Sequence, residues 1–333
     1  MEKISILGAG SWGSVLAGLL SENGHAVTLW DYNPEVLKYL STNLSHMNIK
    51  ELKLKANQIE FEYDLEKAIS GSKYLITAIP AQTYKEFWKK IRKNIGLNVK
   101  IINVSKGIDI ETNKFISQLL ADFIPEYPID NFIALSGPSY AIEVVKKNPT
   151  AVVASSYSLS SAEEVQKIFC NSWFRVYTNT DVVGVELAGA VKNVIAIASG
   201  ISHGIGYGVN TAAALITRGN KEIIRLGLAL GAEETTFYGL AGIGDLILTA
   251  TSELSRNFSF GLLLGQGFSF NEAKSKISTV IEGIETVKST WALSKTYRVE
   301  MPIIEKVYKV LFEGVPPKEA VNQLMLRELK SEY

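Results

Sequence analysis

Residues 4–13 read ISILGAGSWG, a short apolar run followed by three glycines in the spacing G-x-G-x-x-G. The apolar run predicts a buried strand and the residues after Gly10 predict the start of a helix, which is the context that this motif requires. Gly8 would permit the tight turn, Gly10 would let a pyrophosphate approach the backbone, and Gly13 would let the helix pack closely on the strand. The helix N-terminus would offer unpaired N–H groups and partial positive charge to the phosphates. The stretch therefore predicts a dinucleotide site; the alternative is a glycine-rich turn that packs without a ligand.

Asp31 ends the second predicted strand, about 20 residues beyond the glycines, where a carboxylate usually accepts hydrogen bonds from the adenine ribose. A carboxylate there would repel a 2′-phosphate, and no Arg or Lys follows the strand before Lys38, so Asp31 favours NAD over NADP. The alternative is that Asp31 caps the next helix, near Pro34.

The length and composition predict a globular protein of two domains. The chain has 333 residues, of which 47% are hydrophobic and 20% charged, and domains usually hold roughly 100 to 200 residues each. Lys plus Arg (34) equals Asp plus Glu (34), so there is no global positive field for nucleic acid or an anionic membrane. The single cysteine, Cys170, excludes an internal disulfide and favours the cytoplasm.

Two further classes are disfavoured by the spacing of polar residues. The most apolar stretch, residues 182–201, is interrupted by Glu186, Lys192 and Asn193, which argues against a membrane span. The three histidines are widely spaced and show no ligand pattern, which argues against a metal enzyme; they are His25, His46 and His203.

Apolar runs and helical patterns alternate in the first half and predict a Rossmann-type, doubly wound α/β domain over residues 1–181, with a parallel sheet covered on both faces. The expected strands are residues 4–7, 26–30, 74–79, 99–104, 132–135 and 151–154, and the expected helices are 12–22, 83–92 and 113–122. The polar segment 45–60 is expected to be a long connection.

Residues 182–333 are expected to form a mostly α-helical domain, because the strand pattern fades and helical periodicity continues. The expected helices there include residues 209–230, 282–294, 303–312 and 318–326.

Lys192 lies on a predicted helix whose neighbouring positions, three or four residues away, are small and apolar. Such a lysine either extends to the surface or is held, partly desolvated, in a site with space beside it for a ligand. The local sequence leaves these two interpretations open.

Three other segments have the composition of ligand sites. Residues 239–246, GLAGIGDL, are rich in glycine inside a helical domain, which usually marks close backbone approach or a ligand. Ser255 could cap a helix whose first turn carries Arg256 and Asn257, a compact anion site or an ordinary capped surface helix. Residues 105–107 and 136–139 follow predicted strands at their carboxyl ends, where ligands bind in open α/β sheets.

Taken in order, these segments resemble the bacterial NAD(P)-dependent glycerol-3-phosphate dehydrogenases over nearly the whole chain. The order and spacing are more specific than any single segment. The matching segments are GAGSWG at Gly8, SKGI at Ser105, LSGPSYAIEV at Leu135, ELAGAVKNVIAIASGI at Glu186, GLAGIGDL at Gly239, SRN at Ser255 and VIEG at Val280.

The resemblance implies reversible reduction of dihydroxyacetone phosphate to sn-glycerol 3-phosphate with NAD or NADP, supplying glycerophospholipid synthesis, by a homodimer. Lys192 would be the proton donor or acceptor at the substrate C2 oxygen. The substrate would be surrounded by Lys106, Gly137, Ser139, Lys192, Asp245, Ser255, Arg256 and Asn257. The dinucleotide would be bound by Gly8, Gly10, Ser11, Trp12, Gly13, Asp31, Tyr32, Lys106, Ala141, Arg256, Val280 and Glu282. Taken alone, Trp12 would be a core aromatic residue and Glu282 a solvated carboxylate at a helix start.

The chain departs from this family at two places. Members often carry a basic residue just after the second strand, where this chain has Asp31, Tyr32 and Asn33, and this puts a preference for NADP in doubt. Residues 44–47 lack the Pro and Tyr-Leu-Pro pattern common in the family, so no ligand contact is carried over to that loop.

Two other functions fit parts of the pattern. A related 3-hydroxy-acid dehydrogenase would also place a lysine on a long helix, but residues 255–257 suit phosphate better than carboxylate. A non-catalytic dinucleotide sensor would not need both Lys106 and Lys192, although fold alone does not exclude it.

Overall fold

The computed structural model describes residues 2–277, 279–329 and 331–332, which form two compact units. The first comprises Met1–Lys106 and Phe115–Glu186, and the second comprises Gly107–Lys114 and Leu187–Tyr333. The chain therefore crosses between the units inside helix α8 (Val182–Ile205), five residues after the boundary expected at 181/182. Residues 107–114 were expected in the first domain, but their contacts group them with the second unit.

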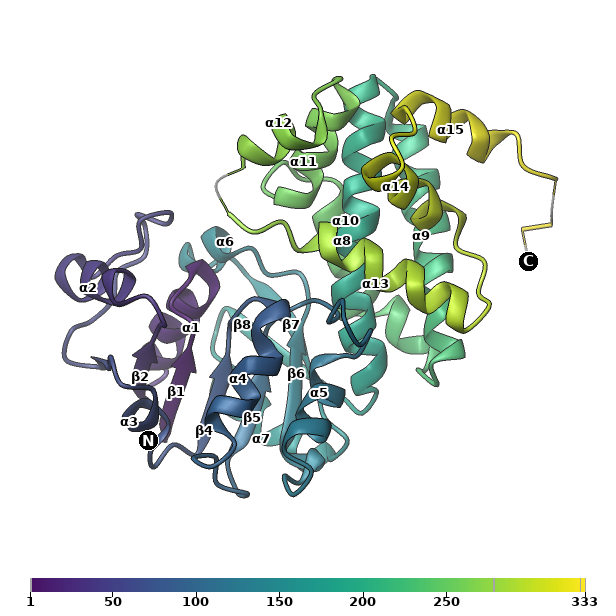
Figure 1. Ribbon diagram of the computed structural model, residues 1–333. Helices are drawn as coiled ribbons and strands as arrows, with labels where there is room; N and C mark the ends of the chain where they lie inside the picture. The colour runs from purple at the N-terminus through teal and green to yellow at the C-terminus, as the bar shows by residue number, and fades with distance from the viewer. Residues whose placement is uncertain (1, 278, 330, 333) are drawn as a thin grey trace. The chain divides into compact units, whose positions relative to one another are not determined.

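Within the described ranges, the first unit contains one eight-stranded sheet with the order β3-β2-β1-β4-β5-β6-β7-β8 (Figure 1). Neighbouring strands are parallel except β6 and β7, which pair antiparallel. The Rossmann-type fold class is thereby confirmed, with one antiparallel pair where only parallel pairing was expected. The strands are β1 (Lys3–Leu7), β2 (Ala26–Trp30), β3 (Ile59–Phe61), β4 (Tyr74–Thr77), β5 (Lys100–Asn103), β6 (Phe132–Ser136), β7 (Thr150–Ser155) and β8 (Phe174–Asn179).

Two of these strands were missed by the pattern of apolar runs. β3 falls in the segment expected to be a connection, and only one of its three residues, Ile59, is buried. β8 begins with alternate buried and exposed residues instead of a continuous apolar run. Edge strands bury less surface than central ones, so their sequences carry a weaker signal.

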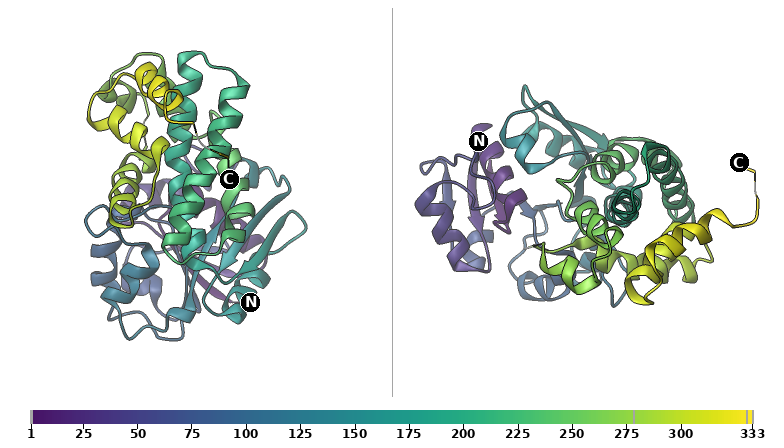
Figure 2. Two further views of the ribbon diagram at one scale, coloured as in Figure 1. Left: turned by 90° about the vertical axis from the view of Figure 1, so that its right-hand side faces the viewer. Right: turned by 90° about the horizontal axis from the view of Figure 1, so that it is seen from above.

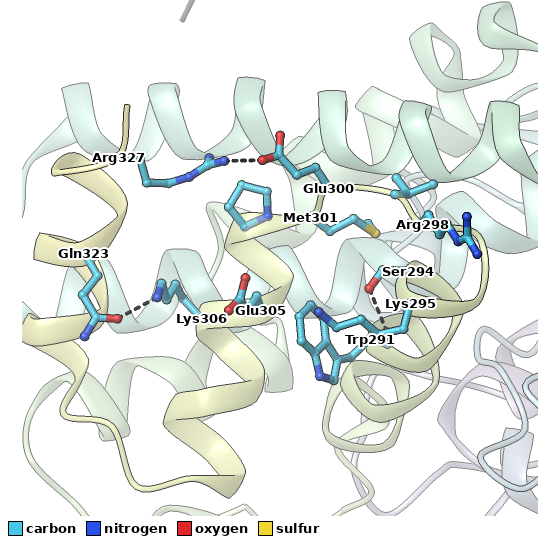
Figure 3. Close-up of a pocket in the computed structure, with 12 residues that line it drawn as sticks. Trp291, Ser294, Lys295, Arg298, Glu300, Met301, Glu305, Lys306, Gln323 and Arg327 are labelled. Atoms are coloured by element: carbon cyan, nitrogen blue, oxygen red, sulfur yellow. Dashed lines mark hydrogen bonds and ion pairs between the residues drawn. The ribbon is translucent and has the colours of Figure 1, made fainter. Parts of the chain in front are cut away.

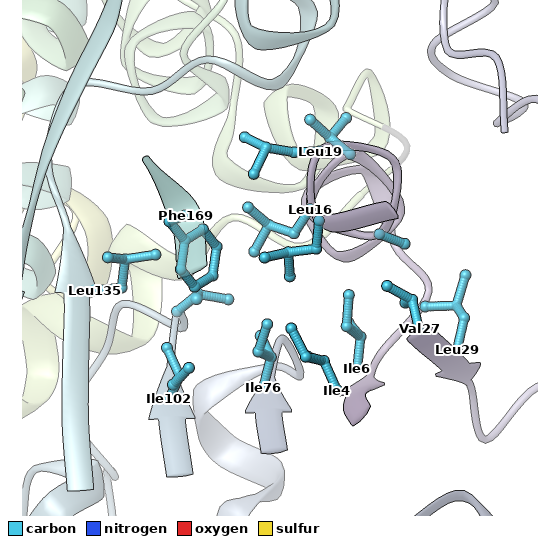
Figure 4. Packing of buried hydrophobic residues seen from close by; sticks show 14 of the residues in the cluster. Ile4, Ile6, Leu16, Leu19, Val27, Leu29, Ile76, Ile102, Leu135 and Phe169 are labelled. Carbon is cyan, nitrogen blue, oxygen red and sulfur yellow. The ribbon is translucent and has the colours of Figure 1, made fainter. Parts of the chain in front are cut away.

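The core of the first unit lies where helix α1 (Ser11–Glu22) packs on the sheet. Figure 4 shows Leu16 and Leu19 of α1 above strand residues such as Ile6 and Ile76, which are completely buried. Phe169 from the end of α7 (Leu159–Phe169) closes the same cluster. This packing fixes the N-terminus of α1 at the carboxyl end of β1, where the glycine motif lies.

The other helices of the first unit are α2 (Pro34–Asn43), α3 (Leu65–Ile69), α4 (Tyr84–Ile91), α5 (Ile116–Phe123) and α6 (Ala141–Val145). Helix α5 begins three residues later than expected, because Asn113 has a φ of 57°. That left-handed conformation is incompatible with a right-handed helix.

The second unit is helical, as expected, and α8 is its central helix (Figure 2). An added Cβ at Gly200 of α8 would lie 2.0 Å from the Phe258 carbonyl oxygen, and one at Gly261 would lie 2.1 Å from the Ile197 carbonyl oxygen. Helix α8 and the helix that contains Gly261, α11 (Arg256–Gly265), therefore pack backbone against backbone. The remaining helices are α9 (Val209–Ala229), α10 (Asp245–Ala250), α11 (Arg256–Gly265), α12 (Phe270–Ser275), α13 (Glu282–Thr296), α14 (Pro302–Phe312) and α15 (Pro317–Met325).

By length and composition alone, α8 could cross a membrane, but 94% of its most apolar stretch is buried inside the protein. A core helix has the same composition, so this feature is weak evidence for a span.

Candidate functional site

The glycine motif forms a turn that has no room for side chains at two positions. Gly8 has a φ of 109°, and its N–H donates to the Trp30 carbonyl oxygen at 2.8 Å. An added Cβ would lie 2.4 Å from the Ala78 carbonyl oxygen. At Gly13 it would lie 1.9 Å from the Gly8 carbonyl oxygen. These are the tight turn and close helix packing expected of the first and third glycines.

Gly10 has the opposite surroundings, because apart from its own chain neighbours no atom lies within 4 Å of the position that its Cβ would occupy. It is the N-cap of α1, and no side chain caps that helix end. An open glycine at an uncapped helix N-terminus fits the pyrophosphate of a dinucleotide, since the backbone N–H groups and the helix dipole favour an anion.

Asp31 connects the end of β2 to the glycine turn. Its two carboxylate oxygens accept hydrogen bonds from the Ala9 N–H at 2.7 Å and from the Asn33 N–H at 2.9 Å. The cap of α2 is Asn33, whose side chain accepts from the Glu35 N–H at 3.1 Å. Asp31 is therefore not the helix cap of the alternative interpretation; it holds the glycine turn in place. Its neighbour Tyr32 is 83% exposed.

Two other residues expected near the dinucleotide lie at helix starts of the first unit. Trp12 is partly buried and packs on the core of that unit, which matches the core-aromatic interpretation. Ala141 is the first residue of α6 and also packs on this core.

Three predicted substrate residues meet at the carboxyl ends of β5 and β6. The Lys106 ammonium donates to the Gly137 carbonyl oxygen at 3.3 Å, and the Ser139 hydroxyl donates to the same oxygen at 3.0 Å. Gly137 has a φ of 142°, and an added Cβ would lie 2.9 Å from Cα of Val152. Sequence segments 31 residues apart are thus joined at one backbone oxygen.

Lys192 is buried in the second unit, with 7% of its side chain exposed. Its ammonium is ion-paired with Asp245, whose side chain is 1% exposed, and donates to Thr249 Oγ1 at 2.8 Å. The Thr249 hydroxyl in turn donates to the Asp245 carbonyl oxygen at 2.7 Å. Lys192 therefore does not extend to the surface; it is held by two groups on α10.

Sequence reasoning missed Thr249. The available signal was its position four residues after Asp245, which places both residues on one face of a helix.

Asn257 joins three helices of the second unit. Its amide nitrogen donates to Asn193 Oδ1 at 2.9 Å, and its amide oxygen accepts from the Gly283 N–H at 2.9 Å. Asn193, which follows Lys192 on α8, was also missed. Because both ends of the Asn257 amide are used, the residue fixes α8, α11 and the start of α13 relative to one another.

The remaining predicted residues lie at or just before the starts of α11 and α13. Ser255 is the N-cap of α11 and accepts from the Phe258 N–H at 3.3 Å, as its sequence position indicated. Arg256 follows it and is exposed. Glu282 begins α13, and Val280 before it is 55% exposed.

Two other buried carboxyl groups have perturbed pKa values. Burial raises the pKa of Glu186 to about 7, although Ser117 donates to it from both its N–H and its hydroxyl. Burial also raises the pKa of Glu222 to about 7, and there the N–H groups of Ile303 and Ile304 donate to the carboxylate at 2.8 and 3.2 Å. Both groups act as caps at helix starts, since the donors lie in the first turns of α5 and α14.

A separate cavity of about 460 Å³ lies between α13, α14 and α15 and contains none of the predicted site residues (Figure 3). Its lysines and arginines are largely engaged: Lys306 donates to Gln323 at 2.6 Å, and Arg327 is paired with Glu300 at 3.1 Å. Among the described residues, no cluster of three or more His, Cys, Asp or Glu side chains could hold a metal ion.

An open glycine turn on a parallel sheet and a buried lysine–carboxylate pair in a helical unit define a class, the dinucleotide-dependent dehydrogenases with a helical second domain. Family models identify the member of that class. Residues 3–162 match the NAD-dependent glycerol-3-phosphate dehydrogenase N-terminus, and residues 181–322 match the C-terminus of the same family. The chain belongs to the NAD-dependent glycerol-3-phosphate dehydrogenase family, which confirms the resemblance inferred from its sequence.

Similar proteins agree with this assignment along the whole chain. The glycerol-3-phosphate dehydrogenase [NAD(P)+] of Geobacter sp. (strain M21) is 46% identical over 332 residues, covering 99% of both chains. That of Clostridium botulinum (strain Alaska E43 / Type E3) is 46% identical over 333 residues, covering 100% of this chain and 99% of the other. The crystal structure of glycerol-3-phosphate dehydrogenase from Coxiella burnetii has a TM-score of 0.93 at 34% identity, covering 98% of this chain and 99% of that one.

Proposed function

We propose that this enzyme interconverts dihydroxyacetone phosphate and sn-glycerol 3-phosphate with NAD(H) or NADP(H). The observation that carries the proposal is the buried Lys192, paired with Asp245 and Thr249 in a chain of this family. A buried, oriented ammonium is suited to proton transfer at a ketone or alcohol oxygen, because it can donate in one direction of the reaction and accept in the other.

When bound, the nicotinamide donates or accepts the hydride at C2 of the substrate. The residues of this chain bind the dinucleotide and the substrate, orient them, and transfer the proton. The N-terminus of α1 binds the pyrophosphate through its N–H groups, with Gly10 allowing close approach. In reduction, the Lys192 ammonium donates its proton to the oxygen on C2, and in oxidation the neutral amine accepts the hydroxyl proton. Asp245 and Thr249 fix the direction of the lysine nitrogen, which keeps the transfer distance short.

Phosphate binding is assigned to Arg256 at the first turn of α11. The residue is exposed, and its guanidinium suits a phosphate monoester. Lys106, Gly137 and Ser139 are assigned to the substrate on the strength of their convergence at the ends of β5 and β6. Asn257 is assigned to the substrate by the family resemblance, and its amide is held within the second unit by Asn193 and Gly283.

The finer points of the assignment rest on single features. Asp31, held between Ala9 and Asn33, favours NAD over NADP, because its charge would repel a 2′-phosphate. We further propose that the enzyme is a cytoplasmic homodimer that supplies glycerol 3-phosphate for glycerophospholipid synthesis, as expected from the family resemblance.

The test is the absorbance change at the reduced-nicotinamide band with dihydroxyacetone phosphate, run with NADH and with NADPH. Rapid oxidation that is absent with non-phosphorylated dihydroxyacetone supports the proposal, and the faster cofactor decides the role of Asp31. The Lys192→Ala variant should bind NADH normally and turn over at least about a hundred-fold more slowly. NADH binding without oxidation in the unmodified enzyme would refute the proposal and favour a dinucleotide sensor.

A further inference from the structure

A buried polar network links the loops that follow β4 and β5. The hydroxyl of Tyr84, a fully buried residue at the start of α4, donates to Asn103 Oδ1 at 2.7 Å. The Ser105 hydroxyl donates to the Ile79 carbonyl oxygen at 2.6 Å, and the Tyr84 and Ser105 hydroxyl oxygens lie 2.9 Å apart. The Tyr84 oxygen is also 3.3 Å from the Thr77 carbonyl oxygen. Tyr84 thereby contacts three positions at the carboxyl ends of two strands, and Ser105 adds a fourth at Ile79.

Asn103, which accepts from the Tyr84 hydroxyl, also binds the backbone of Ser105. Its amide nitrogen donates to the Ser105 carbonyl oxygen at 3.1 Å, and its amide oxygen accepts from the Ser105 N–H at 3.1 Å. Both polar backbone groups of Ser105 are therefore bound to one side chain, which leaves that residue little conformational freedom. Lys106 is the next residue, and its ammonium reaches the Gly137 carbonyl oxygen at 3.3 Å.

The ring and the hydroxyl of Tyr84 have separate roles. The ring packs in an aromatic cluster, with centroids 6.0 Å from Phe87 and 5.4 Å from Trp88. A phenylalanine would keep these contacts, so the cluster does not explain a tyrosine here. The hydroxyl contacts Asn103 and Ser105, which lead to Lys106, and a buried network of hydrogen bonds restricts the geometry of the groups that it joins.

We propose that Tyr84, acting through Asn103 and Ser105, is a positioning residue that sets the place of the Lys106 ammonium for the reaction. The inference rests on the proposed function, in which Lys106 contacts the substrate. Removing the hydroxyl leaves Asn103 Oδ1 with one donor fewer and frees the loop at Ser105. Misplacement of a catalytic-site group by about 1 Å can slow turnover by about a hundred-fold, so loosening this loop should slow it by about ten-fold.

The experiment uses Tyr84→Phe with Tyr127→Phe as its matched control. Tyr127 is also a buried tyrosine bound to β5, but at the opposite end: its hydroxyl donates to the Val99 carbonyl oxygen at 2.7 Å and accepts from the Ile101 N–H at 3.2 Å. Both variants lose one buried hydroxyl next to the same strand. Ser105→Ala is a second variant in the network, for use if Tyr84→Phe does not fold.

Three readouts are compared: kcat with dihydroxyacetone phosphate and NADH, the Kd of NADH by fluorescence, and the Kd of dihydroxyacetone phosphate by calorimetry in the non-reacting complex with NAD+. For Tyr84→Phe we expect about a ten-fold loss of kcat and about a ten-fold weaker Kd for the phosphorylated ketone, with the NADH Kd changed less than about three-fold. Tyr127→Phe should change none of these, even if it lowers the urea midpoint. In a Lys106→Ala background, Tyr84→Phe should have no further effect.

Four other outcomes would overturn the inference. Equal kcat in Tyr84→Phe and the unmodified enzyme would overturn the inference, as would equal losses in the two tyrosine variants. A full Tyr84→Phe effect in the Lys106→Ala background, or a Lys106→Ala enzyme with normal turnover, would also overturn it. Failure of the proposed function is distinct, because the unmodified enzyme would then show no turnover at all.

Discussion

The contributions of Lys192 and Asp245 to the free energy of unfolding should depend strongly on each other. The two side chains are 7% and 1% exposed, so removing either partner leaves an uncompensated charge in the interior. Breaking a buried pair in this way costs about 3–5 kcal/mol, whereas replacing both partners by neutral groups is often nearly neutral. Lys192→Met and Asp245→Asn should therefore each destabilise by about 3–5 kcal/mol, and the double variant by about 2–3 kcal/mol less than the sum of the two.

The expected coupling free energy is about 2–3 kcal/mol, near the upper end of what contacting residues show. It is measured by urea unfolding of the four proteins of the double-mutant cycle at pH 7, using tryptophan fluorescence. A surface pair supplies the control: Lys89 and Glu86 approach to 2.6 Å, but their side chains are 51% and 80% exposed. Their coupling should stay below about 0.5 kcal/mol.

Additive effects at Lys192 and Asp245, within about 0.5 kcal/mol, would refute the reasoning. Such additivity would mean that the two charges do not depend on each other for burial. The orientation of Lys192 by Asp245, on which the proposed proton transfer depends, would then lose its physical basis. The same result would leave the role of Thr249 unsupported, since both groups bind the same nitrogen.

Three further predictions follow from the same geometry. Gly13→Ala forces a methyl group to 1.9 Å from the Gly8 carbonyl oxygen and should destabilise the first unit. Gly10→Ala should show normal stability in urea titrations but bind NADH about ten-fold more weakly. Equal stability of the two variants would contradict this prediction. Burial gives Glu186 and Glu222 a pKa of about 7 in the folded protein against an ordinary value of 4.5, so the folded state retains protons between these values and stability should fall as pH rises from 4.5 to about 7 and then level off. Glu222→Gln should flatten that decline in urea midpoints across the range, and an unchanged slope would contradict the assignment. Ser255→Ala removes the cap of α11 and should cost about 1 kcal/mol in urea unfolding, and no loss would show that the 3.3 Å contact is not a cap.

Much of the fold could be predicted because its signals are local. The central strands are continuous apolar runs, and α1, α9, α13 and α14 show helical periodicity that survives in the structure within a few residues. The errors also have local causes. β3 buries a single residue, β8 alternates in burial, and the φ of 57° at Asn113 delays α5, a constraint that periodicity does not encode.

The site could be predicted in part. Gly8, Gly10 and Gly13 were assigned roles from spacing alone, and their surroundings match those roles, because each requirement concerns the backbone of the same turn. The choice between a buried and a surface Lys192 could not be made from its helix, since its partners lie 53 and 57 residues away. The part played by Asp31 was similarly open until the hydrogen bond from Ala9 was seen.

The sequence by itself determined the class of fold, the glycine turn and the family, because these depend on residue type and spacing along the chain. Only the tertiary structure decided that residues 107–114 pack with the second unit, that Thr249 and Asn193 stand beside the predicted residues, and that Tyr84 is tied to the Lys106 loop. These are contacts between side chains on different elements, brought together by burial of surfaces that lie far apart in the chain. The periodicity of apolar residues indicates that one face of a helix or strand is buried, but only the tertiary packing determines which residues that face contacts.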